Sequence, residues 1–155
     1  MTARIGVVGI GWWATFNHIP TVQASGDADI VAICDLDAER LRIAGDRFGI
    51  DARYTDLAEM LAAEKLDGVM VSTPHVAHTA PAIAALDASC HVLVEKPMAT
   101  SAADGRAIAA AAGRASRCVG PGGCGAWPAA CSAKSRHPPA TARGSATRPE
   151  TAPPR

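Results

Sequence analysis

The stretch Ile5-Gly-Val-Val-Gly-Ile-Gly-Trp-Trp-Ala14 decides the fold expected for this chain of 155 residues. A short apolar run leads directly into the pattern Gly9-x-Gly11-x-x-Ala14, and helix-compatible sequence follows. A buried strand, a tight glycine turn and a helix start in this order are typical of a site for the pyrophosphate of a dinucleotide. Because simple turns can carry the same pattern, the rest of the chain has to decide between the two interpretations.

Strand-like and helix-like segments alternate over residues 1–112. We predict strands at 4–8, 30–34, 52–54, 68–72 and 91–94, and helices at 12–24, 37–48, 56–64, 77–88 and 101–112, the first kinked or split by Pro20. The strands are continuously apolar, which favours a parallel sheet buried on both faces. Right-handed crossovers then give a doubly wound, Rossmann-like α/β domain with five strands in the order 3-2-1-4-5, which binds ligands at the carboxyl ends of its strands.

Residues 113–155 differ from this domain in composition. They hold seven Lys and Arg against one acidic residue, whereas residues 1–112 hold eight against fourteen. They also contain seven of the eleven prolines and no Leu, Ile, Met, Phe or Tyr. With so little apolar surface to bury, we predict a disordered Arg/Pro/Ala/Gly-rich tail, no sixth strand, and a marginally stable domain whose fifth strand is an exposed edge.

Two interpretations of the tail stay open. Its composition is what GC-rich coding DNA tends to give when read out of frame, so the leading interpretation is a frameshift after about residue 112. The alternative is a genuine basic tail that binds an anionic partner. Nucleic-acid binding is not expected, because the tail has neither interleaved aromatic residues nor clusters of Lys and Arg.

The five cysteines show no Cys-x-x-Cys pair and no zinc-binding spacing, so we expect no metal site. The N-terminus has no secretory signal, and no apolar stretch is long enough to span a membrane. We therefore expect a cytoplasmic protein without membrane association.

Asp35 follows the second predicted strand. An acidic residue there can accept hydrogen bonds from the adenosine ribose and repels a 2′-phosphate. Leu36 supplies no positive charge, so both residues favour NAD over NADP. The alternative is a solvated loop acid, since Asp37 lies close by.

Two further motifs end the fourth and fifth predicted strands. Ser72-Thr73-Pro74 and the following His78 are placed on the opposite side of the same site, although His78 can equally be a helix-start residue without a chemical role. In Glu95-Lys96-Pro97 the lysine follows a buried strand, and taken alone it is expected to be a strand-end charge that reaches solvent. The alternative is that burial desolvates the lysine and makes its ammonium group a useful proton or hydrogen-bond donor. His18 is expected to be a structural histidine of the first helix.

Together, Gly-Ile-Gly-Trp-Trp-Ala, Ala-Ile-Cys-Asp, Ser-Thr-Pro-His-Val-Ala-His and His-Val-Leu-Val-Glu-Lys-Pro resemble the Gfo/Idh/MocA oxidoreductases, the relatives of glucose-fructose oxidoreductase and inositol 2-dehydrogenase. The Glu-Lys-Pro segment is the most specific. The resemblance covers about residues 4–112, which correspond to most of the family's N-terminal cofactor domain.

The resemblance implies NAD(P)-dependent hydride transfer at a hydroxyl carbon of a sugar or cyclitol. The implied contacts are with the pyrophosphate at Gly9, Ile10, Gly11, Trp12 and Trp13, the adenosine at Asp35 and Leu36, the nicotinamide side at Ser72, Thr73, Pro74 and His78, and the nicotinamide ribose and substrate hydroxyl at Glu95 and Lys96. Lys96 is the implied catalytic residue, which polarises the reacting oxygen. The bond before Pro97 is often cis in the family.

The family's second α/β domain supplies most substrate contacts, an Asp and His pair for proton transfer, and the oligomer interface. We recognise none of this domain in the sequence, so we expect NAD binding with little or no turnover. The alternatives are a non-catalytic NAD-binding sensor or partner module and, less favoured, an anion-binding protein that acts through its basic tail.

Overall fold

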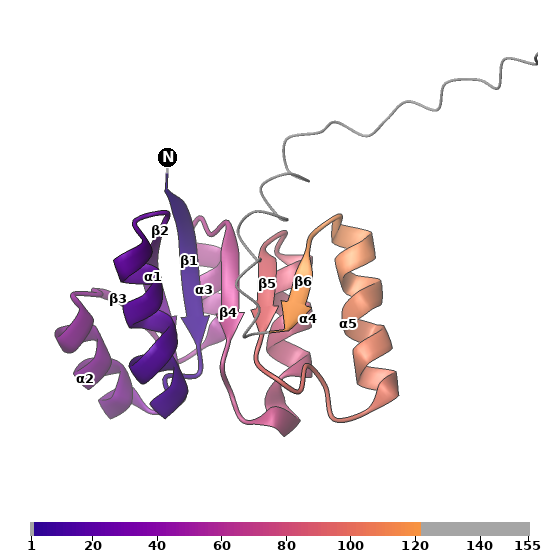
Figure 1. The fold of residues 1–155 in the computed structure, drawn as a ribbon, viewed down its shortest axis with the longest axis horizontal. Coiled ribbons are helices and arrows are strands. Elements are labelled where there is room, and N and C mark those ends of the chain that lie inside the picture. The colour runs from indigo at the N-terminus through magenta and orange to yellow at the C-terminus, as the bar shows by residue number, and fades with distance from the viewer. Residues whose placement is uncertain (1, 122–155) are drawn as a thin grey trace, which may run out of the picture.

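Six parallel strands form one sheet in the computed structural model, which describes residues 2–121 (Figure 1). The strand order is β3-β2-β1-β4-β5-β6. The strands are β1 (Ala3–Val8), β2 (Ala28–Cys34), β3 (Ala52–Tyr54), β4 (Gly68–Val71), β5 (His91–Val94) and β6 (Val119–Pro121). The helical segments are the π-turn η1 (Ala14–His18), α1 (Ile19–Ser25), α2 (Ala38–Phe48), α3 (Leu57–Ala63), the 3-10 turn η2 (His75–Ala77), α4 (Thr79–Asp87) and α5 (Ala102–Ala115). The predicted doubly wound, Rossmann-like fold is confirmed.

The sixth strand corrects the expectation of five strands. Helix α5 continues to Ala115, and β6 then pairs with β5 in parallel, with Val119 opposite Val92 and Pro121 opposite Val94. Sequence reasoning missed β6 because Val119 has no apolar run around it and the strand ends in proline, which only an edge strand tolerates. Strand β5 is therefore not an edge. Residues 122–155, on which most of the tail prediction falls, lie outside the described residues.

Apolar side chains pack on both faces of the sheet because successive residues of a strand point to opposite sides. One layer contains strand residues together with Ile19 of α1 and Leu41 of α2. The other joins the sheet to α3, α4 and α5, and its fully buried side chains include Met60, Val69, Val71, Leu86, Val92 and Ile108. Two buried faces are what the continuously apolar strands predicted, and they fix the loops at each edge of the sheet.

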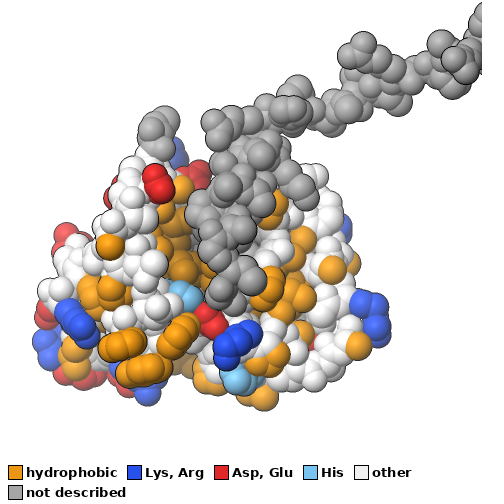
Figure 2. Space-filling view, in the orientation of Figure 1, with side chains coloured by type: hydrophobic (Ala, Val, Ile, Leu, Met, Phe, Trp, Pro, Cys, Tyr) orange, Lys and Arg blue, Asp and Glu red, His pale blue; other side chains and the backbone are white. Residues whose placement is uncertain are grey.

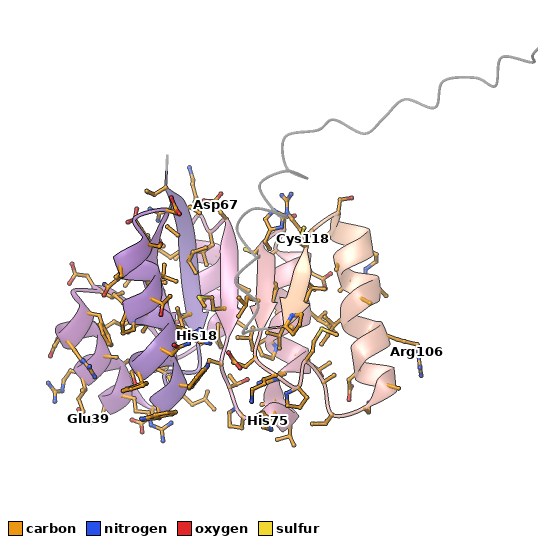
Figure 3. All side chains as sticks on the ribbon, viewed as in Figure 1. His18, Glu39, Asp67, His75, Arg106 and Cys118 are labelled. Carbon is orange, nitrogen blue, oxygen red and sulfur yellow. The ribbon has the colours of Figure 1, made fainter. Side chains whose placement is uncertain are left out.

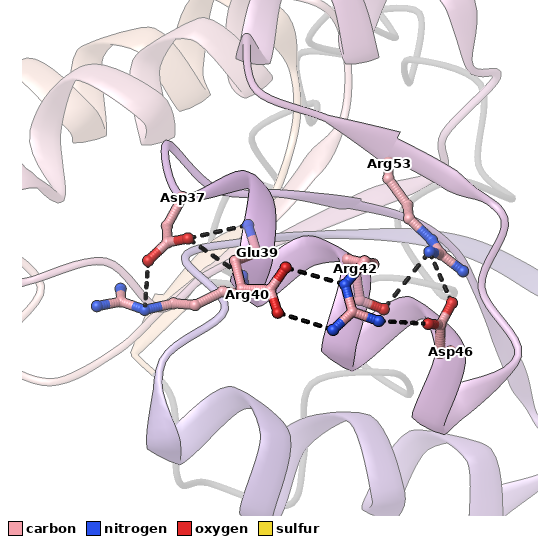
Figure 4. Close-up of polar contacts among 6 residues, drawn as sticks. All are labelled: Asp37, Glu39, Arg40, Arg42, Asp46 and Arg53. Atoms are coloured by element: carbon pink, nitrogen blue, oxygen red, sulfur yellow. Dashed lines mark hydrogen bonds and ion pairs between the residues drawn. The ribbon is translucent and has the colours of Figure 1, made fainter.

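Helix α2 begins at a side-chain cap directly after β2. The carboxylate of Asp37 accepts hydrogen bonds from the backbone N–H groups of Glu39 and Arg40 (Figure 4). Arg42 then pairs with Glu39 and Asp46 along the helix surface. These pairs are exposed, so each contributes less than about 1 kcal/mol. The cap matters more for the site, because it sets where the first turn of α2 lies relative to the end of β2.

Candidate dinucleotide-binding site

The loops at the carboxyl ends of β1, β2 and β4 surround an open cleft of about 370 Å³. This edge lies where β2 and β4 flank β1 on opposite sides, which is the usual ligand position in doubly wound sheets. Apolar side chains gather at this end of the face shown in Figure 2, and Figure 3 places His18 and His75 toward it. The cleft is lined by Gly9, Gly11, Trp12, Trp13, Asp35, Arg40, Ser72, Thr73, Pro74 and His75.

The two glycines of the first loop meet different requirements. Gly9 has φ +87°, and a Cβ there would lie 2.6 Å from the backbone nitrogen of Thr73. The fold itself therefore needs glycine at this position. A Cβ on Gly11 would meet no protein atom within 4 Å, and Gly11 lines the cleft. The space beside Gly11, at the start of a helical segment, fits a pyrophosphate group.

Asp35 connects the glycine loop to the end of β2. Its Oδ2 accepts a hydrogen bond of 2.7 Å from the backbone N–H of Ile10, and its Oδ1 accepts one of 2.9 Å from that of Asp37. The side chain is 10% exposed. A carboxylate has further lone pairs, so Asp35 can still accept a hydrogen bond from the hydroxyl group of a ligand in the cleft. The alternative of a fully solvated loop acid does not fit this geometry.

Arg40 is a site residue that sequence reasoning missed. It lines the cleft, and its guanidinium lies 3.4 Å from a carboxylate oxygen of Asp37 and 3.9 Å from one of Asp35. The signal was available, because the first turn of a helix that follows β2 lies at the same edge as Asp35. Leu36, by contrast, is 93% exposed and is not among the lining residues.

The turn after β4 places Ser72, Thr73 and Pro74 in the wall of the cleft, as the sequence predicted. His78 is fully buried behind this turn. Its Nε2 lies 2.8 Å from the carbonyl oxygen of Thr73, and its Nδ1 lies 2.9 Å from that of Pro97. In this position His78 joins the two loops and presents no surface to a ligand, so the prediction that His78 contacts a cofactor directly is wrong for this structure.

Several polar groups contact the carboxylate of Glu95, which directly follows β5. Its Oε1 accepts a hydrogen bond of 2.9 Å from the indole N–H of Trp13 and lies 2.8 Å from Nε2 of His18. Its Oε2 accepts one of 3.1 Å from the backbone N–H of Lys96. Lys96 itself is exposed, which agrees with the expected charge that reaches solvent and not with the alternative of a lysine desolvated at the strand end. The Lys96–Pro97 bond is cis.

Cys34, the last residue of β2, is buried beside this site. Burial and then the neighbouring carboxylates of Asp35 and Asp56 raise the pKa of its thiol to about 11. The thiol therefore stays protonated at neutral pH and does not act as a nucleophile. Within residues 2–121, no group of three His, Cys, Asp or Glu side chains is arranged to hold a metal ion, and no helix is long and apolar enough to cross a membrane.

Fold and site together define a dinucleotide-binding Rossmann domain. Residues 3–122 match the Gfo/Idh/MocA family described as "Oxidoreductase family, NAD-binding Rossmann fold", and the chain belongs to this family. The match runs past residue 112, where we had expected the resemblance to end, and includes β6.

Sugar and cyclitol dehydrogenases are among the relatives that this chain resembles. The chain is 41% identical over 109 residues to D-apiose dehydrogenase of Paraburkholderia graminis, covering 70% of this chain and 29% of the relative. It is 33% identical over 105 residues to inositol 2-dehydrogenase of Salmonella typhimurium, covering 67% and 31%. An oxidoreductase from Agrobacterium radiobacter in complex with NAD+, L-tartaric acid and magnesium has a TM-score of 0.75 and 30% identity, covering 79% of this chain and 35% of that one. The chain thus spans about a third of these proteins.

Proposed function

We propose that this chain binds NAD at the carboxyl edge of its sheet and serves hydride transfer at a hydroxyl carbon of a sugar or cyclitol. The observation that carries the proposal is the joining of the glycine loop to Asp35 through the Ile10 N–H, beside open space at Gly11. The pyrophosphate would lie along Gly9–Trp13 and the adenosine ribose at Asp35. The nicotinamide would lie between the Thr73-Pro74 turn and the Glu95-Lys96 loop. The bound nicotinamide supplies the hydride chemistry.

Lys96 is the residue proposed to act on the substrate. Its exposed side chain leaves the loop beside Glu95, so its ammonium group can donate a hydrogen bond to the reacting oxygen. Donation there stabilises the charge that develops as the carbonyl oxygen is reduced or the hydroxyl is oxidised. Sugar or cyclitol substrates are proposed because several dehydrogenases similar to this chain carry the names of such substrates.

NAD is proposed as the preferred cofactor. The carboxylate of Asp35 would repel the 2′-phosphate of NADP, whereas it can accept a hydrogen bond from the free 2′-hydroxyl of NAD. Arg40 weakens this preference, since it brings a guanidinium to the same end of the cleft. We therefore expect tighter binding of NAD, with measurable binding of NADP.

Substitution of Lys96 distinguishes the proposed role in catalysis from the binding of the cofactor. Affinity for NADH is measured by fluorescence, and turnover is measured as formation of NADH from NAD with D-apiose or myo-inositol. We expect Lys96→Met to bind NADH within about threefold of the wild-type chain and to abolish any turnover, because only the proton donor is lost. Turnover by Lys96→Met at the wild-type rate would exclude Lys96 as the catalytic residue.

The same assay addresses the alternative that the chain binds NAD without catalysis, as a sensor or partner module. The chain spans about a third of the length of its relatives. Substrate contacts that the relatives make with the other two thirds of their chains have no counterpart in residues 2–121. Saturable NADH binding with no turnover on either substrate would favour this alternative. Turnover by the 155-residue chain would exclude it.

A further inference from the structure

Glu95 is held from the glycine-loop side by the side chains of Trp13 and His18, and the proposed function assigns no role to these two contacts. Trp13 donates its indole N–H to Oε1 of Glu95, and Nε2 of His18 approaches the same oxygen to 2.8 Å. The His18 side chain is 8% exposed, and its Nε2 is buried without an aligned hydrogen bond among the described residues. A buried polar atom of this kind destabilises the fold unless a partner satisfies it, and Glu95 is the group in reach.

The π-turn η1 explains why both side chains point at Glu95. In an α-helix, residues five apart lie on different sides, because one turn takes 3.6 residues. In η1 the backbone N–H of Ile19 instead donates to the carbonyl of Ala14, five residues earlier. This wider turn brings Trp13 and His18 to the same side, where their rings meet edge to face at a centroid distance of 6.2 Å.

The sequence contains a physical cause for the wide turn. Pro20 has no N–H group, so it cannot donate the α-helical hydrogen bond to the carbonyl of Phe16. Helix α1 accordingly starts at Ile19 with the proline in its first turn. Where the sequence predicted a kink or split beside Pro20, the backbone changes from the π-turn to α1 between His18 and Ile19, and one consequence is the placement of His18.

We propose that His18 is a positioning residue for Lys96, which it orients through Glu95. Oε1 of Glu95 contacts the side chains of His18 and Trp13, and Oε2 accepts a hydrogen bond from the backbone N–H of Lys96. The loop that carries Lys96 is thereby fastened to the glycine loop, so that the two sides of the nicotinamide site keep a fixed spacing. The consequence for substrate and cofactor rests on the proposed function, whereas the placement of Lys96 can be measured without either.

The test uses NMR of the full chain with its lysine amines converted to ¹³C-dimethylamines, which keep their charge. The chain has three lysines, Lys65, Lys96 and Lys134, and Lys96→Arg assigns the signal of Lys96. We expect His18→Leu to move the Lys96 signal toward its position in the urea-unfolded chain. His18→Gln, whose side-chain N–H can still reach Glu95, should restore the wild-type position. The matched control His91→Gln makes the same change at the opposite edge of the sheet and should leave the signal in place.

NADH affinity provides the second measurement. Because the proposed nicotinamide site includes the Glu95-Lys96 loop, His18→Leu, which removes the polar contact with Glu95, should weaken NADH binding by about tenfold, and His18→Gln by less than about threefold. If His18→Leu does not fold, His18→Asn takes its place, because asparagine is polar but too short to reach Glu95. A folded Leu or Asn variant with the wild-type Lys96 signal would overturn the proposal. Absence of NADH binding by the wild-type chain would refute the proposed function alone, since the Lys96 signal is measured without NADH.

Discussion

At the scale of single residues, a substitution at Gly9 should affect folding, whereas the same substitution at Gly11 should affect binding of NAD. Gly9→Ala forces a side chain onto a positive φ and against the backbone of Ser72 and Thr73, so we expect the free energy of unfolding to fall by about 2 kcal/mol or more. Gly11→Ala meets no protein atom, so the free energy of unfolding should stay within about 0.5 kcal/mol of wild type. NAD affinity of this variant should nevertheless fall at least about tenfold, because the added methyl group occupies the pyrophosphate space.

Urea unfolding and NAD titration of the two variants check this prediction. The glycine loop would have a different role if Gly11→Ala bound NAD as tightly as the wild-type chain. Our assignment of a structural role to Gly9 would fail if Gly9→Ala were as stable as wild type.

At this scale the sequence predicted where some side chains lie in the fold, but not what each of them contacts. Asp35 was placed correctly, because a carboxylate after β2 must lie at the carboxyl edge. His78 was misplaced, because its spacing from Pro74 does not reveal that the 3-10 turn η2 directs its ring inward to carbonyl oxygens of Thr73 and Pro97. The side chain of Lys96 is exposed, as the residues alone favoured, because the chain leaves the sheet directly after Val94.

At the scale of elements, the attachment of β6 depends on His91. Its Nδ1 accepts a hydrogen bond of 3.1 Å from the backbone N–H of Cys118, which requires that nitrogen to be unprotonated. Burial, and then the positive charge of Arg117, lower the pKa of His91 from its ordinary value of 6.5, while Asp67 opposes the shift. Figure 3 shows Asp67 and Cys118 toward the edge of the sheet opposite His18.

This arrangement predicts a pH dependence of stability. As pH falls below 6.5, His91 of the unfolded chain takes up a proton before His91 of the folded chain does. The free energy of unfolding contributed by His91 is therefore fully present above that pH and decreases as pH falls toward the lowered pKa. Urea unfolding of the wild-type chain and of His91→Asn should give a difference that changes between about pH 7.5 and pH 5. A difference that is constant with pH would contradict this role.

Strand β6 also shows which helices and strands cannot be predicted from patterns in the sequence. The first five strand-helix units follow from apolar runs and turn residues, and their existence and order are confirmed. Strand β6 has no such run, since it is fixed by backbone pairing with β5 and by contacts such as the Arg117 side chain on the carbonyl of Ser89. Likewise, the π-turn is not visible as a periodicity, although Pro20 marks its position.

At the scale of the whole molecule, the two-sided core places every proposed cofactor contact at one edge. Helices α1 and α2 pack on one face of the sheet and α3, α4 and α5 on the other, so the loops after β1, β2, β4 and β5 are anchored on rigid elements. The sequence predicted this arrangement because parallel strands joined by helices leave little topological choice. It could not predict the cross-loop contacts of Glu95 and His78, which depend on tertiary packing.

The central claim, that NAD binds at this edge, is tested most directly by titrating the ¹⁵N-labelled chain with NAD and following its backbone amide signals. The account predicts saturable shifts at Gly9–Trp13, Asp35, Thr73 and Lys96, weaker binding of NADP, and unchanged signals at His91 and Cys118. Shifts that do not saturate, or that are confined to the edge of His91 and Cys118, would contradict it.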